Sequence, residues 1–96
     1  MLVAGLTAPA APTLNAPMVS GSTVTVSWSD GTGGTPSNYT LTASNTPGGT
    51  PIASVPLTGT STSFAGVPSG TYYLWLTATN AAGTSPPSAQ VTVTVP

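Results

Sequence analysis

The side chains that could carry out catalysis are almost absent from this sequence. Its 96 residues include one acidic side chain and no lysine, arginine, histidine or cysteine, and the formal net charge is −1. General acid–base catalysis needs a group that titrates near neutral pH, and a nucleophilic hydroxyl needs an adjacent base. The single carboxylate, Asp30, cannot form a carboxylate pair or a serine triad by itself. We therefore predict no catalytic residue and no enzymatic activity.

The glycines that follow Asp30 do not form a ligand site either. Aspartate followed by glycine favours a turn, so we interpret Asp30 and Gly31 as loop residues. Gly33 and Gly34 lack the lysine and the helix of a phosphate-binding loop. Without thiol or imidazole ligands we predict no metal site, and no motif indicates a cofactor. Nucleic acid is excluded as a partner, because phosphate neutralisation needs lysine or arginine.

Tyr73 and Trp75 are the strongest candidates for a binding surface. In a strand they would lie on the face opposite Tyr72, Leu74 and Leu76, because successive side chains alternate between faces. Exposed aromatic rings on a flat sheet can stack on sugar rings or anchor a protein interface. The alternative is that cross-strand packing covers both rings.

The elements that would position these residues are β-strands. Eleven glycines and eleven prolines separate short segments rich in valine, threonine and aromatic residues, and no segment has the spacing of an amphipathic helix. The alternation predicts seven strands, at residues 12–19, 23–28, 39–44, 52–57, 61–64, 71–79 and 91–95. Strands of this length and spacing are typical of an antiparallel β-sandwich.

The strand faces rich in apolar residues predict the core and its surroundings. On the strand predicted at 39–44, Thr40 and Thr42 would add a flat polar surround to the two aromatic rings. Hydrophobic residues make up 39% of the chain, which is enough for a two-layer core. The predicted structural core contains Trp28, Tyr39, Leu41, Phe64, Tyr72, Leu74 and Leu76.

Three segments, in this order, carry a family resemblance. They are Val24-Thr25-Val26-Ser27-Trp28, Val67-Pro68-Ser69-Gly70-Thr71-Tyr72, and residues 72–88 with the closing valine strand. Together they resemble the fibronectin type III domain, especially its versions in bacterial extracellular proteins. The first segment is similar to the family's second strand, which ends in a core tryptophan. The second is similar to the family's tyrosine corner, which implies that the Tyr72 hydroxyl bonds to nearby backbone.

The resemblance implies an immunoglobulin-like fold over residues 11–96, after an N-terminal tail at 1–10. It also implies a non-catalytic spacer or interaction module of a larger secreted protein, located outside the cell or at its surface. Residues 80–85 lack the Arg-Gly-Asp sequence through which some members bind integrins. No segment is long enough to span a membrane, and residues 1–6 lack the basic region of a signal peptide.

Three functions remain open at this stage. The first is a structural or protein-interaction module of a multidomain extracellular protein. The second is a carbohydrate-binding module that uses Tyr73 and Trp75. The third is an engineered scaffold from which charged surface residues have been removed, because natural surfaces usually carry mixed charge. Self-association is also open, since the chain has almost no charge to oppose it.

Overall fold

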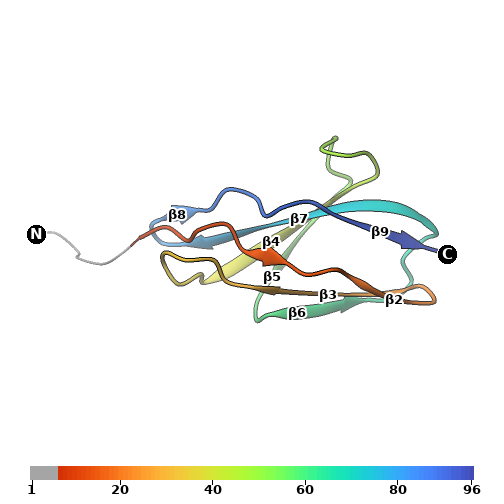
Figure 1. Cartoon of the computed structure of the whole chain (residues 1–96), viewed down its shortest axis with the longest axis horizontal. Coiled ribbons are helices and arrows are strands. Elements are labelled where there is room, and N and C mark those ends of the chain that lie inside the picture. Colours follow the sequence, from red (N-terminus) through yellow and green to blue (C-terminus); the bar gives the residue numbers. More distant parts are fainter. Residues whose placement is uncertain (1–6) are drawn as a thin grey trace, which may run out of the picture.

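The computed structural model describes residues 7–96, and within them the chain forms two antiparallel sheets and no helix (Figure 1). One sheet contains β1, β2, β3 and β6, and the other contains β4, β5, β7, β8 and β9. The predicted all-β sandwich is confirmed. The strands are β1 (Thr13–Leu14), β2 (Met18–Ser20), β3 (Thr23–Ser29), β4 (Asn38–Ser44), β5 (Ala53–Leu57), β6 (Ser61–Phe64), β7 (Gly70–Asn80), β8 (Gly83–Thr84) and β9 (Val91–Val95).

One of the seven predicted strands is divided, and one predicted loop contains an additional short strand. The strand predicted at residues 12–19 is divided into β1 and β2, which both pair with β3 and are separated by a segment that contains Pro17. The residues predicted as a loop at 80–88 include the short strand β8, which pairs with the end of β7. Proline has no backbone N–H to donate to a ladder. The interruptions therefore lie where Pro17, Pro86 and Pro87 occur in the sequence.

The register of the five-stranded sheet decides which side chains share a face. On β4, Leu41 lies opposite Leu76 of β7, and Thr42 lies opposite Trp75. On the other side of β7, Tyr73 lies opposite Thr92 of β9. Because side chains alternate along a strand, the leucines point between the two sheets and the aromatic and threonine side chains point away from them.

The core lies between the sheets and is built from alternating residues of both. Its buried members are Leu14, Val24, Val26, Trp28, Tyr39, Leu41, Leu74, Leu76, Ala78, Val93 and Val95. The rings of Trp28 and Tyr39 pack against each other across the two sheets, with centroids 5.4 Å apart and planes tilted by 59°. Phe64 and Tyr72, which the sequence also places in the core, are half-buried and pack against it.

The predicted N-terminal tail covers residues 1–10, of which residues 1–6 lie outside the described part of the chain. The described remainder pairs with the glycine-rich loop after β3. The amide of Ala10 donates to the carbonyl of Thr32 at 3.0 Å, and the amide of Gly34 donates to the carbonyl of Ala8 at 3.3 Å. A Cβ on Gly34 would collide with the carbonyl oxygen of Thr7. This glycine is therefore required by a close approach of two backbone segments.

Candidate functional site

The surface that could bind a partner is the solvent side of the five-stranded sheet. We call it the outer face. Its central strand, β7, carries the two aromatic residues singled out in the sequence, Tyr73 and Trp75, and both are half-buried. The ladders of β4 and β9 place threonines beside them. The outer face consists of Thr40, Thr42, Ser44, Tyr73, Trp75, Thr77 and Thr92, of which Ser44 is buried.

The two rings are neither part of the core nor fully exposed. They alternate along β7 with Leu74 and Leu76, of which only 5% and 0% of the surface is exposed. Thr42 lies beside Trp75, and Ser44 and Thr92 lie on either side of Tyr73, because cross-strand partners are about 4.5–5.5 Å apart at Cβ. The rings are thus supported laterally but keep part of their surface open to solvent.

The hydroxyl groups beside the rings differ from those at the ends of the sheet. At the ends, the hydroxyls of Thr79 and Thr84 bond to each other at 3.0 Å, and those of Thr71 and Thr94 lie 3.5 Å apart. Within residues 7–96, no side-chain hydrogen bond is formed by the threonines of the outer face, which are Thr40, Thr42, Thr77 and Thr92. Their hydroxyls are free to bond to a ligand.

Thr77 and Thr92 also belong to this surface. Each alternates with buried residues on its own strand, so a period-two pattern predicts that it faces solvent. Such a pattern cannot tell which strands are neighbours. The pairing of β7 with β4 and β9 supplies that information.

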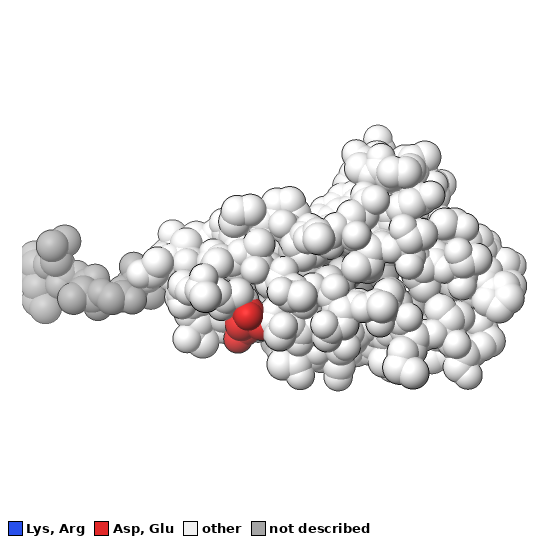
Figure 2. Space-filling view, in the orientation of Figure 1, with Lys and Arg blue, Asp and Glu red and all other residues white. Residues whose placement is uncertain are grey.

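The outer face carries no charge. Asp30, the one charged side chain in the sequence, is an exposed residue directly after β3, near the end of the molecule at which the described chain begins (Figure 2). Its carboxylate accepts a hydrogen bond from the hydroxyl of Tyr39. Burial and this hydrogen bond raise the pKa of Tyr39 to about 12. Asp30 therefore anchors a tyrosine of the core, and the sequence offers it no second carboxylate and no amine, imidazole or thiol side chain as a partner for acid–base chemistry.

Residues 7–96 contain neither a cluster of metal-ligating side chains nor a membrane-spanning helix. Those residues contain no group of three or more histidine, cysteine, aspartate or glutamate side chains that could hold a metal ion. They also form no helix that is long and apolar enough to cross a membrane.

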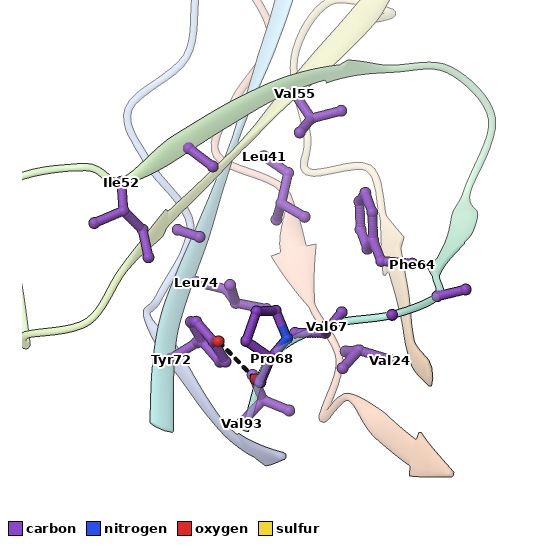
Figure 3. A pocket seen from close by; sticks show the side chains of 14 residues that line it. Val24, Leu41, Ile52, Val55, Phe64, Val67, Pro68, Tyr72, Leu74 and Val93 are labelled. Atoms are coloured by element: carbon purple, nitrogen blue, oxygen red, sulfur yellow. Dashed lines mark hydrogen bonds between the residues drawn. The ribbon is translucent and has the colours of Figure 1, made fainter. Parts of the chain in front are cut away.

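A cavity of about 440 Å³ opens between the two sheets beside β5 and β6 (Figure 3). Phe64 and Val55 come from these strands, whereas Leu41 and Leu74 reach it from the core. The one side-chain hydroxyl in its lining belongs to Tyr72, and it donates to the carbonyl of Pro68 at 2.7 Å. Ligand sites usually combine apolar walls with a few polar groups that orient the ligand. This cavity has apolar walls but no free polar side chain, so the outer face is the stronger candidate for a ligand-binding site.

The hydrogen bond of Tyr72 also stabilises the turn that leads into β7. It links residues only four positions apart, directly before the strand that carries the aromatic pair. The bond is the one that the resemblance implied for a tyrosine corner.

Ser85 and Ser88 have a structural role that the sequence analysis missed. The hydroxyl of Ser85 accepts from the amide of Ala78, and that of Ser88 accepts from the amide of Leu76, each at 2.9 Å. Between the two serines the chain contains Pro86 and Pro87, and here, between β8 and β9, regular pairing with β7 is interrupted. The serine hydroxyls therefore satisfy the buried amides of β7 next to the aromatic residues. The sequence feature that could have indicated this role is the pair of serines on either side of two consecutive prolines, close after a long strand.

The arrangement of the two sheets defines an immunoglobulin-like β-sandwich. Residues 8–94 match the family model described as the fibronectin type III domain. The chain belongs to the fibronectin type III family, and the resemblance noted in the sequence is confirmed. Domains of this family are commonly structural or interaction modules of multidomain proteins, often extracellular or at the cell surface.

Solved structures agree with this assignment of the fold. The chain is similar to the chicken CNTN1 FN1–FN3 domains, with a TM-score of 0.74 and 24% identity, over 92% of this chain and 33% of that one. It is also similar to the twitchin kinase region from C. elegans, with a TM-score of 0.73 and 26% identity, over 92% of this chain and 17% of that one. The chain thus spans a third or less of these two structures. No curated protein matches it in sequence.

Proposed function

We propose that this domain is a non-catalytic module that separates and presents its neighbours in a multidomain extracellular protein. The observation that carries the proposal is the position of the two ends of the described chain. The side-chain amide of Asn80 donates to the carbonyl of Thr7 at 2.8 Å, whereas Val95 pairs with Gly70. Asn80 and Gly70 are the two ends of β7. The chain therefore enters at one end of the sandwich and leaves at the other (Figure 1).

The length of β7 sets the distance that the module would span. This strand contains 11 residues, and a strand rises about 3.3 Å per residue, which gives a span of roughly 35 Å. A flexible linker of equal length has no fixed end-to-end distance. A folded sandwich instead holds its neighbours apart and keeps the outer face exposed along its side.

The absence of catalytic groups supports the same proposal. With one carboxylate and no amine, imidazole or thiol side chain, the domain has no general base to activate one of its many hydroxyls. We infer that any function depends on shape and on surface contacts.

The spacing can be tested directly, because the chain contains no cysteine. Cysteines introduced by Ala8→Cys and Pro96→Cys would carry spin labels for a distance measurement. We expect a narrow distribution centred at roughly 35 Å or more, from the length of β7. The control is the same labelled protein in denaturant, which should give a broad distribution. A short distance in the folded protein would contradict a role as a spacer.

A further inference from the structure

We propose that the outer face binds a neutral polysaccharide, with Tyr73 and Trp75 as the stacking platform and the neighbouring threonines as hydrogen-bonding partners. The inference rests on the proposed function in one respect: it names the partner that the exposed side of the module would contact.

The first argument is the order of side chains across the sheet. The two rings are two residues apart on β7, which corresponds to about 6.7 Å along the strand. Thr42 lies opposite Trp75 on one side, and Thr92 lies opposite Tyr73 on the other. A row of aromatic surface is therefore bordered on both sides by hydroxyls. A pyranose ring has the matching chemistry, with C–H groups on its faces and hydroxyls around its rim.

The second argument concerns the availability of those hydroxyls. In the described part of the chain, the threonines of the outer face make no hydrogen bond through their side chains, whereas the more distant pair Thr79 and Thr84 bond to each other. A hydroxyl that already has a protein partner must lose it before it can bond to a sugar. The hydroxyl of Ser44, opposite Tyr73, already donates to the carbonyl of Thr50. The hydroxyls of Thr42 and Thr92 beside the rings are free, so these two can bond to a sugar at no such cost.

The third argument is charge. Asp30, the single charged side chain of the sequence, lies in the loop after β3 and not on the outer face. An acidic polysaccharide or a strongly charged protein would lose hydration here without gaining an opposite charge. A neutral polysaccharide carries only hydroxyls, ring oxygens and C–H groups, so it avoids this cost.

The fourth argument separates a polysaccharide from a second copy of this chain, which is equally uncharged. Tyr73 and Trp75 are half-buried, and side chains that anchor protein interfaces typically fill pockets on the partner. Stacking on a sugar requires only that part of the aromatic ring is exposed to solvent. The platform also lies on β7, which pairs with β4 along both rings and with β9 as far as Leu74, so little conformational entropy is lost when a ligand binds.

The test is sedimentation of the full chain with four insoluble neutral polysaccharides: microcrystalline cellulose, chitin, mannan and granular starch. Calcium alginate beads serve as the acidic comparison. We expect binding to at least one neutral polysaccharide and none to alginate. The variants Trp75→Thr and Tyr73→Thr should each weaken that binding about tenfold or more. Threonine is a good strand former, so these variants retain the backbone preference of β7.

Two further variants show whether a loss of binding is specific to the outer face. Trp75→Tyr keeps an aromatic platform, and it should retain binding to within about threefold. Met18→Thr changes a residue that is 74% exposed on the other sheet, and it should bind like the wild type. Far-ultraviolet circular dichroism and thermal melting, recorded for each variant, distinguish lost contacts from lost folding.

Three results would overturn the proposal. The first is that none of the four polysaccharides retains the folded wild type. The second is that the folded double variant Tyr73→Thr/Trp75→Thr binds as well as the wild type. The third is self-association that Trp75→Thr abolishes, measured by light scattering, since the occupant would then be a second copy. The distance measurement on labelled ends is independent of all three, so a failure here leaves the spacer role intact.

Discussion

Tyr39 shows how one residue can link the core to the single charge of the protein. Its ring is 6% exposed and packs on Trp28, while its hydroxyl donates to the carboxylate of Asp30. Burial and the adjacent carboxylate both disfavour the tyrosinate form, so the pKa of Tyr39 rises from 10.0 to about 12. At this scale, the chemistry of Asp30 is that of a structural hydrogen-bond acceptor.

The raised pKa of Tyr39 predicts a loss of stability at alkaline pH. A folded-state pKa above the unfolded value means that folding favours the protonated tyrosine. This contribution to the free energy of unfolding is therefore complete below pH 10 and is lost as the pH rises through about 12. Thermal melts from neutral to alkaline pH should show the midpoint falling in that window.

Two variants assign the alkaline effect to Tyr39. Tyr39→Phe should remove the tyrosinate absorbance step with a pKa of about 12. Asp30→Asn keeps an oxygen acceptor but removes the charge, so the pKa of Tyr39 should fall while burial still holds it above the ordinary value. An unchanged absorbance titration in both variants would contradict this interpretation.

The last two strands show how an element can be interrupted without leaving buried amides unpaired. Between β8 and β9 the chain contains two consecutive prolines, and the amides of Leu76 and Ala78 on β7 bond to serine hydroxyls. Both serines are themselves buried, Ser85 at 6% and Ser88 at 7% exposure. The central strand that carries the aromatic pair thus keeps its hydrogen bonds along the interrupted edge.

We expect Ser85→Ala and Ser88→Ala to destabilise the domain by about 1–3 kcal/mol each, because each leaves a buried amide without its acceptor. Chemical denaturation would give the change in the free energy of unfolding. Hydrogen exchange should show faster exchange of the amide of Ala78 in the first variant and of Leu76 in the second. The matched control is Ser54→Ala on edge strand β5, an exposed position where the change should stay within about 0.5 kcal/mol. Equal effects at all three positions would show that the hydroxyl contacts do not matter.

At the scale of the whole molecule, the near absence of charge sets the response to solution conditions. No lysine, arginine or histidine exists to pair with Asp30, so no side-chain salt bridge contributes to stability. Charge repulsion between copies is nearly absent, so only hydroxyl groups, exposed backbone and edge prolines oppose their association.

This composition predicts that stability hardly changes between about pH 5 and pH 9, because pH dependence needs groups whose protonation changes on folding. Increasing the salt concentration at neutral pH should also have little effect, since there are no ion pairs to screen. Thermal melts over both ranges provide the measurement. A large shift of the midpoint within the neutral pH range would mean that the folded state depends on a titrating group not identified among Asp30 and the tyrosines.

The amino-acid sequence by itself determined the fold class and most of the core. Strict alternation around Val24, Val26 and Trp28, and again around Leu74 and Leu76, fixes which face each strand buries, because side chains in a strand have a period of two. The lack of titratable groups was likewise a property of composition. These are local features, and they need no knowledge of which strands are neighbours.

Only the tertiary structure decided the features that depend on contacts between distant segments. The division of the predicted strand at residues 12–19, the acceptor role of Ser85 and Ser88, and the bond from Tyr39 to Asp30 all require partners brought together by folding. The same holds for the outer face, where Thr42 of β4 lies beside Trp75 and Thr92 of β9 lies beside Tyr73. Alternation predicts the direction of a side chain, whereas strand pairing decides its neighbours.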